Sequence, residues 1–222
     1  MTARKIFCVG FNKTGTTSLA EYFSQCGLTT CHWPSIVDGV DFEARCADVW
    51  DQPERVLDQL APVMGAYQVH SDVPWSGLVA ELMIQHPGSQ FILSTRSPDG
   101  WWNSLDAHWA LGARRHRMSP FERIQFQRYM PGVDRHFGRE HRDELVGAFL
   151  AHREYVAETV PPDLLLQLDI DEGNIAGKLS EFTGTDPSVS FPEAAPRPAS
   201  PIKAIRRIAR SLTRRRRFGP GW

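Results

Sequence analysis

The chain has 222 residues, of which 41% are hydrophobic and 23% charged, and its formal net charge at pH 7 is −1. This length suits one ordinary domain with a buried core, and the composition is that of a globular protein rather than a fibrous or low-complexity one. No apolar run approaches the roughly 20 residues that a membrane-spanning helix needs, and the N-terminus does not resemble a signal peptide, so we expect a cytoplasmic protein.

Strands and helices alternate in the hydrophobic pattern. Residues 5–10 predict a buried strand, and residues 16–25 predict a helix that ends before Gly27. This alternation predicts the α/β fold class, a three-layer αβα domain with a central parallel sheet. The further expected strands are 28–31, 66–70, 90–95 and 164–168, and the further expected helices are 75–86, 99–113, 120–160 with a break at 131–132, and 174–182.

The charge is divided unevenly along the chain. Glu193 is the last acidic residue, and nine of the 25 basic residues follow it, which leaves 16 basic residues against all 26 acidic residues before that point. Four prolines between 192 and 201 predict a linker. We therefore expect one domain over residues 1–193 and a Pro-rich linker with a basic tail over residues 194–222.

The loop between the first strand and the first helix reads GFNKTGTT, residues 10–17. Free backbone N–H groups at a helix N-terminus, with a flexible glycine, make an anion-binding site, and the hydroxyls of Thr16 and Thr17 add donors. The glycines have Walker A spacing, but Thr16 occupies the lysine position and the loop's lysine, Lys13, lies three residues earlier. The loop therefore predicts anion binding and disfavours nucleotide triphosphate hydrolysis.

The strand predicted at 90–95 is followed directly by Arg96, and Ser104 lies eight residues further on. An arginine fork suits a phosphate monoester, and open α/β sheets bind ligands at the carboxyl ends of their strands. The alternative for Arg96 is a structural ion pair.

These segments together resemble the P-loop sulfotransferases, over about residues 4–193. KTGTTSL (residues 13–19) is similar to the family's 5′-phosphosulfate loop, and FILSTR (residues 91–96) with Ser104 is similar to its 3′-phosphate motif. VHSDVPW (residues 69–75) is similar to the segment that holds the catalytic base in cytosolic sulfotransferases.

The resemblance implies in-line transfer of a sulfonate group from 3′-phosphoadenosine 5′-phosphosulfate (PAPS) to a hydroxyl or amine, without a metal. It implies that Lys13 contacts the bridging oxygen, that the loop holds the 5′-phosphate, and that Arg96 and Ser104 hold the 3′-phosphate. Ser18 departs from the family, which has an aromatic residue there that stacks on adenine. The expected donor-binding residues are Asn12, Lys13, Thr14, Gly15, Thr16, Thr17, Ser18, Arg96 and Ser104.

The catalytic base is the second departure from the family pattern. Aligned on Pro74, the family's histidine falls on Asp72, which makes Asp72 the expected base, provided that burial raises its pKa toward the working pH. His70 and His32 are the alternatives. A non-catalytic alternative is that Asp72 caps the helix that follows it.

Two other functions stay open: a P-loop kinase or NTPase, and an inactive nucleotide-binding interaction protein. The acceptor is a small molecule, a carbohydrate or a lipid, and the sequence does not indicate an oligomeric state. Residues 202–217 carry apolar residues at helical spacing among arginines. This pattern suits either a solvated tail or attachment to an anionic inner-membrane surface, and nucleic-acid binding is not favoured.

Overall fold

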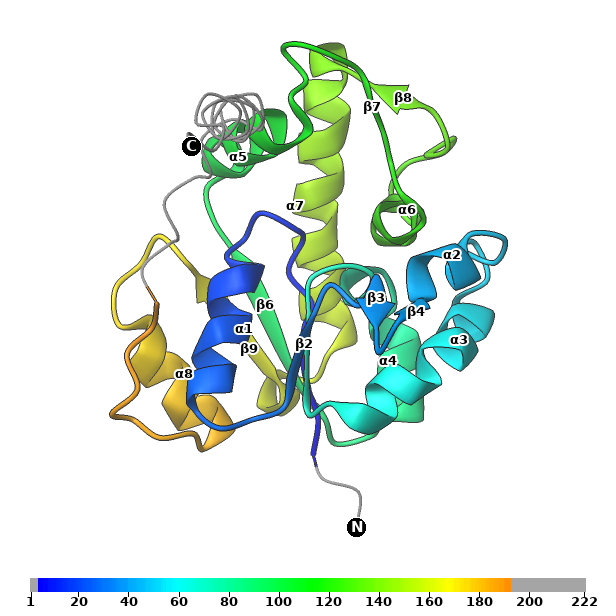
Figure 1. Ribbon diagram of the computed structural model, residues 1–222. Coiled ribbons are helices and arrows are strands. Elements are labelled where there is room, and N and C mark those ends of the chain that lie inside the picture. Colours follow the sequence, from blue (N-terminus) through cyan, green and yellow to red (C-terminus); the bar gives the residue numbers. More distant parts are fainter. Residues whose placement is uncertain (1–3, 193–222) are drawn as a thin grey trace, which may run out of the picture. The chain divides into compact units, whose positions relative to one another are not determined.

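The computed structural model describes residues 4–192, so the predicted linker and basic tail lie outside the described residues. At its centre is a five-stranded sheet with the strand order β2-β5-β1-β6-β9, in which every neighbouring pair is parallel (Figure 1). These strands are β1 (Ile6–Cys8), β2 (Thr30–His32), β5 (Val69–Ser71), β6 (Gln90–Thr95) and β9 (Leu165–Asp169).

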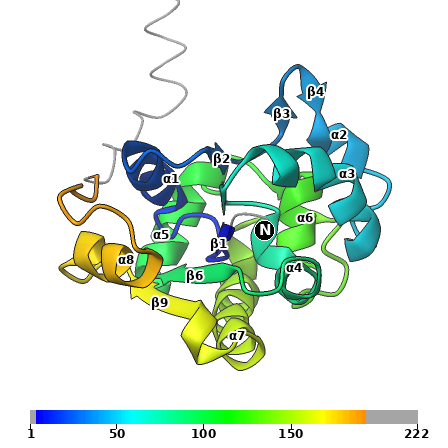
Figure 2. The same ribbon diagram turned by 90° about the horizontal axis from the view of Figure 1, so that it is seen from below.

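Helices cover both faces of this sheet, which confirms the predicted αβα architecture (Figures 1 and 2). One face carries α1 and α8, and the other carries α3, α4 and α7. The α-helices are α1 (Thr16–Gln25), α2 (Phe42–Cys46), α3 (Pro53–Ala66), α4 (Val79–Gln85), α5 (Pro98–Trp109), α6 (Pro120–Phe126), α7 (Arg142–Thr159) and α8 (Ile175–Thr183). Short 3-10 turns are η1 (Trp75–Gly77), η2 (Arg139–His141) and η3 (Pro162–Leu164).

The first strand shows how the sequence builds two cores. Successive side chains of a strand point to opposite faces of the sheet. Ile6 and Cys8 accordingly pack with α1 and α8, whereas Phe7 and Val9 pack with α3, α4 and α7. The strand is therefore apolar at every position, as expected for the centre of a parallel sheet covered on both sides.

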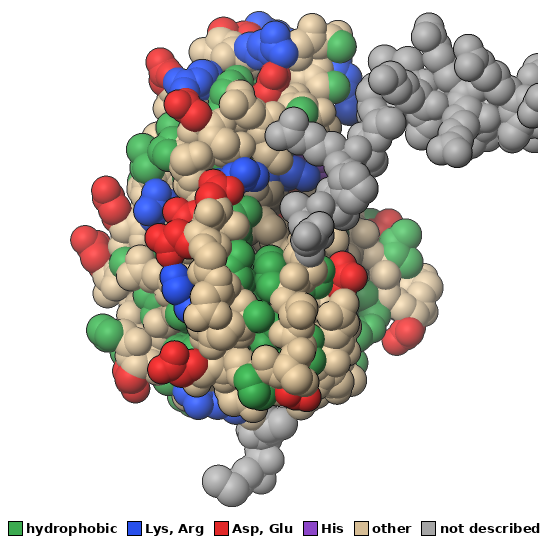
Figure 3. All heavy atoms as spheres, turned by 90° about the vertical axis from the view of Figure 1, so that its left-hand side faces the viewer, with side chains coloured by type: hydrophobic (Ala, Val, Ile, Leu, Met, Phe, Trp, Pro, Cys, Tyr) green, Lys and Arg blue, Asp and Glu red, His purple; other side chains and the backbone are tan. Residues whose placement is uncertain are grey.

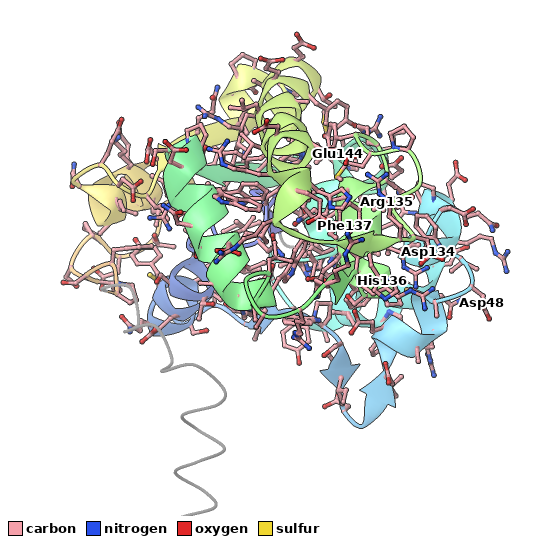
Figure 4. All side chains as sticks on the ribbon, turned by 90° about the horizontal axis from the view of Figure 1, so that it is seen from above. Asp48, Asp134, Arg135, His136, Phe137 and Glu144 are labelled. Carbon is pink, nitrogen blue, oxygen red and sulfur yellow. The ribbon has the colours of Figure 1, made fainter. Side chains whose placement is uncertain are left out.

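Two small antiparallel ribbons accompany the central sheet: β3 (Ile36–Val37) with β4 (Val40–Asp41), and β7 (His116–Arg117) with β8 (His136–Phe137). The β7–β8 ribbon is fixed to α7, because Arg135 forms an ion pair with Glu144 and its guanidinium lies 5.0 Å from the centre of the Phe137 ring (Figure 4). This region stands beyond the carboxyl ends of the central strands, on the side where ligands bind in such sheets.

The helical stretch predicted over residues 120–160 is interrupted at the expected break, 131–132, but the interruption is much longer than predicted. Residues 127–141 interrupt it with a loop, β8 and η2, so that only α6 and α7 are helical. The predicted helix over 75–86 also begins as a 3-10 turn. Gly77 lies in that turn, and a Cβ at this position would lie 2.1 Å from the carbonyl oxygen of Ile124, so η1 passes directly against α6.

Charged side chains of both signs are interspersed on the face of the molecule shown in Figure 3. The helices within residues 4–192 include none that is both long enough and apolar enough to cross a bilayer.

Candidate functional site

Four of the predicted site segments follow four neighbouring strands. His32 ends β2, Asp72 follows β5, the Lys13 loop follows β1, and Arg96 follows β6. Because the strand order is β2-β5-β1-β6 and all are parallel, the segments lie in that order along the carboxyl edge of the sheet. The topology therefore brings together residues that are far apart in the sequence.

Two glycines shape the loop after β1. A Cβ at Gly10 would lie 2.3 Å from the carbonyl oxygen of Ser94, so the loop starts in direct contact with β6. Gly15 has a φ of 83° and precedes the first turn of α1, where no side chain caps the helix. The free N–H groups of that turn carry the positive end of the helix dipole, which suits a phosphate or sulfonate oxygen.

Lys13 adds a positive charge beside this helix end. Its backbone has a left-handed φ of 70°, and its side chain is half-buried. Burial lowers the pKa of the Lys13 ammonium, and the negative charge of Asp72 acts in the opposite direction. Lys13 and Asp72 are thus close enough to interact electrostatically.

Asp72 is the centre of a polar cluster and is only 8% exposed. Its Oδ1 accepts a hydrogen bond from the backbone N–H of Val73 (2.9 Å), and its Oδ2 accepts one from the Thr16 hydroxyl (3.1 Å). His32 Nε2 lies 3.5 Å from the same Oδ2 and 3.2 Å from the Thr17 hydroxyl. The cluster therefore joins two candidate bases to the first two residues of α1.

The structure gives no support to the capping alternative for Asp72. No side chain caps η1, the turn that begins at Trp75, and both oxygens of Asp72 contact the groups just described. The carboxylate instead faces the start of α1.

His70, the other predicted alternative, does not join this cluster. It is fully buried, with its ring 5.1 Å from that of Phe7 and 4.8 Å from that of Trp75. Burial, helped by the positive charge of Lys5, lowers the pKa of His70 to about 3. The ring is therefore a neutral core group, placed there because it points to the α3–α4 side of β5.

Several predicted donor-binding side chains point into the protein. The Thr14 hydroxyl donates to the carbonyl oxygen of Phe11 (2.6 Å) and contacts the Ser94 hydroxyl (2.8 Å). The Asn12 side chain bonds to Gln125, and Ser18 is buried on α1. These residues shape the loop. Lys13 and Thr17 are more exposed, whereas the buried Thr16 hydroxyl faces Asp72.

Arg96 forms the predicted alternative contact, an ion pair. Its Nη2 lies 3.2 Å from Oδ1 of Asp171, while its buried Nε has no hydrogen-bond partner among the described residues. The guanidinium lies against the first turn of α5, where a Cβ at Gly100 would be 3.1 Å from Nε. Ser104 follows Gly100 by one helical turn and shares its face of α5, so Arg96 and Ser104 border the same space.

Sequence reasoning missed the residues that support the loop from behind. Trp101 Nε1 donates to the carbonyl oxygen of Asn12 (2.9 Å), and His152 Nε2 lies 2.6 Å from the carbonyl oxygen of Val9. It also missed His108 on α5, whose pKa is lowered by burial and by the nearby positive charge of Lys13. Single polar residues inside helices carry no local signal, so only the fold reveals these contacts.

No group of three or more His, Cys, Asp or Glu side chains within residues 4–192 is arranged to hold a metal ion. The metal-free character of the reaction stays a prediction. What the site offers is an anion-binding helix end, two cations and a carboxylate.

Comparison with known proteins shows the family and the fold. Residues 5–198 match the family model described as "Sulfotransferase domain". The crystal structure of a sulfotransferase from Alicyclobacillus acidocaldarius shares the fold, with a TM-score of 0.51 and 14% sequence identity over 96% of this chain and 94% of that chain. "Ava biosynthesis cluster protein M" from Aspergillus versicolor is 27% identical over 114 residues, a stretch that covers 46% of this chain and 41% of that protein.

Proposed function

Since the chain belongs to the sulfotransferase domain family, we propose that it transfers a sulfonate group from PAPS to a hydroxyl or amine of an acceptor. The observation that carries the proposal is the placement of Lys13 and Asp72 at the uncapped start of α1, with Arg96 at the end of the adjacent strand. An anion site, a cation for the leaving group and a base for the acceptor then lie along one edge of the sheet.

We infer one orientation for the donor along this edge. The free N–H groups of α1 and the Thr17 hydroxyl would hold the 5′-phosphate. The expected donation from the Thr16 hydroxyl would require that hydroxyl to release Oδ2 of Asp72, because it has a single hydrogen to donate. Arg96, with Ser104 on the neighbouring face of α5, would hold the 3′-phosphate, because a guanidinium fork matches a phosphate monoester. The buried, unpartnered Nε of Arg96 supports this assignment, since a phosphate oxygen would satisfy it.

Residues of the site can take up both the charge and the proton that the transfer step releases. The acceptor oxygen or nitrogen forms a bond to sulfur as the bond from sulfur to the bridging oxygen breaks, and 3′-phosphoadenosine 5′-phosphate leaves. Negative charge develops on the bridging oxygen, where the Lys13 ammonium stabilises it. The acceptor proton passes to the Asp72 carboxylate, and His32, 3.5 Å from Oδ2, lies beside the resulting acid.

The reaction itself can be tested with ³⁵S-labelled PAPS and acceptors of three classes: a phenol, an oligosaccharide and a glycolipid. We expect label on one class and an equal amount of 3′-phosphoadenosine 5′-phosphate. Hydrolysis of ATP with magnesium, together with no consumption of PAPS, would contradict the proposal and favour the kinase or NTPase alternative.

A further inference from the structure

Gln125 lies on α6 and is fully buried, and its side-chain amide joins two segments of the candidate site. Its Oε1 accepts hydrogen bonds from the backbone N–H of Asn12 (3.0 Å) and from the Ser76 hydroxyl (3.0 Å). Its Nε2 donates to the Asn12 side-chain oxygen (3.2 Å). Asn12 directly precedes Lys13, and Ser76 lies four residues after Asp72.

We propose that Gln125 is a positioning residue that fixes the Lys13 loop relative to the Asp72 segment. This inference rests on the proposed function, because it assigns Gln125 a role in setting the distance between the leaving-group cation and the base. Gln125 itself bonds to Asn12 and Ser76, and not to either of these two side chains.

The loop side of this bridge is held at three points. Gln125 bonds to the backbone N–H and the side-chain oxygen of Asn12, and Trp101 bonds to its carbonyl oxygen. The next residue, Lys13, has the left-handed φ of 70° that is unfavourable for a residue with a Cβ. Surrounding contacts must hold such a conformation. The hydrogen bonds to the N–H and the carbonyl oxygen of Asn12 do this, because they fix the residue directly before Lys13.

The Asp72 side of the bridge depends on close packing between η1 and α6. Gly77 follows Ser76, and any Cβ there would overlap the carbonyl oxygen of Ile124, the residue before Gln125. The absence of a side chain at 77 therefore lets the Ser76 hydroxyl reach the Gln125 amide. Both lone pairs of Oε1 are used, one for each segment, so a shift of either segment disturbs the bond to the other.

A double-mutant cycle tests the coupling through the affinity for 3′-phosphoadenosine 5′-phosphate, measured by calorimetry. We expect Gln125→Met, which keeps the side-chain length, to weaken binding at least tenfold, and Ser76→Ala to weaken it about threefold. In the Gln125→Met background, Ser76→Ala should have no further effect, because the bond it removes is already absent. Independent effects that multiply in the double variant would overturn the proposal.

Amide hydrogen exchange of the ligand-free protein tests the bridge without relying on the proposed function. Gln125→Met should speed exchange at least tenfold in both residues 10–17 and residues 72–77. The matched control is Gln90→Met, because Gln90 is also a buried glutamine, but it lies at the amino end of β6 and bonds to the carbonyl oxygen of Phe182. Gln90→Met should leave both segments unchanged.

The two measurements separate the possible failures. If the wild-type protein binds no 3′-phosphorylated nucleotide, the proposed function is wrong. The exchange data would still show whether Gln125 links the Lys13 loop to the Asp72 segment. Faster exchange in only one of the two segments, or equal effects of both glutamine variants, would overturn the bridge itself. Ser76→Ala removes a single hydroxyl and should speed exchange in the same two segments, so it provides the test if Gln125→Met does not fold.

Discussion

The Thr16 hydroxyl donates a hydrogen bond to Oδ2 of Asp72 across 3.1 Å. A second bond runs the other way between the same segments, from the Ser71 hydroxyl to the carbonyl oxygen of Thr16 (2.9 Å). The first turn of α1 and the end of β5 are thus joined into one unit. In the proposed reaction, the part that binds the donor phosphate and the part that holds the base therefore move together.

Lys13 should matter most in the transition state, where charge develops on the bridging oxygen. We expect Lys13→Ala to lower kcat by about 10²- to 10³-fold, the usual cost of removing one such electrostatic donor. The affinity for 3′-phosphoadenosine 5′-phosphate should fall much less. Single-turnover release of this product from PAPS measures the rate. Lys178→Ala serves as the control, because Lys178 on α8 pairs with Glu172, which is not among the expected site residues. A Lys13→Ala rate within a factor of three of wild type would contradict the assigned role.

Asp72 and His32 can be distinguished as bases by substitutions that keep a polar side chain of similar size. Asp72→Asn keeps an oxygen that can accept from Val73 N–H but removes the carboxylate, and we expect kcat to fall by about 10²- to 10⁴-fold. His32→Gln should cost about tenfold or less, since His32 only neighbours Oδ2 in the proposed step. The same single-turnover assay applies. If the histidine variant loses more activity than the aspartate variant, the base is His32.

Arg96 is shared between Asp171 and the expected 3′-phosphate. Arg96→Ala should weaken binding of 3′-phosphoadenosine 5′-phosphate by about 10- to 150-fold, since hydrogen bonds to charged groups contribute about 1.5–3 kcal/mol. Asp171→Asn should instead strengthen binding by up to about fivefold, because it removes a competing, half-exposed ion pair. Calorimetry with ADP, which lacks the 3′-phosphate, is the control. Equal effects on both nucleotides would place Arg96 away from the 3′-phosphate.

Buried His70 should make the fold sensitive to acid. Its pKa is lowered to about 3 in the folded state by burial, against about 6.5 in the unfolded chain, so the unfolded state binds more protons between these values. The stability that the neutral ring contributes is complete above pH 6.5 and is lost as the pH falls toward 3. Urea unfolding at pH 7, 6 and 5 should show a shallower pH dependence for His70→Leu, by up to about 1.4 kcal/mol per pH unit near pH 5. An unchanged slope would mean that His70 is protonated in the folded protein.

The basic tail lies outside the described residues, and its attachment to a membrane surface stays a prediction. If the tail attaches to an anionic membrane surface, the full chain should float with vesicles that contain anionic lipid and remain in solution with neutral ones, whereas a solvated tail predicts no flotation with either. Replacing the four arginines 214–217 with glutamine should abolish flotation and leave nucleotide binding intact. Equal flotation of both proteins would favour a solvated tail instead.

Local patterns in the sequence predicted the elements that carry the chemistry. The bounds of α1 and β6 match the expected helix at 16–25 and strand at 90–95. The helix α1 could be predicted because it ends at a glycine turn, and the strand β6 because its apolar centre is flanked by polar residues. The helix α3 was not predicted, and it contains Pro62, which normally indicates a break. It forms nevertheless because its apolar side packs on the sheet.

The supporting contacts of the site could not be predicted in the same way. Asn12 and Gln125 are 113 positions apart, and nothing near either residue indicates the other. Likewise, alignment on Pro74 favoured Asp72 as the base, but the sequence could not rank the two alternatives, His70 and His32, against each other. Only the orientation of the strands separates Asp72 and His32, which face the start of α1, from His70, which lies in the core.

The most direct test of the central claim is nucleotide selectivity in thermal unfolding. Wild-type protein and Arg96→Ala would each be heated with 3′-phosphoadenosine 5′-phosphate, with ADP, and with ATP and magnesium. A ligand at about 100 times its Kd adds about 2.7 kcal/mol, which raises the Tm of a chain this long by several degrees. We predict such a rise with the 3′-phosphorylated nucleotide alone, lost in Arg96→Ala. A rise with ATP and magnesium, and none with the 3′-phosphorylated nucleotide, would contradict PAPS as the donor and favour the kinase or NTPase alternative.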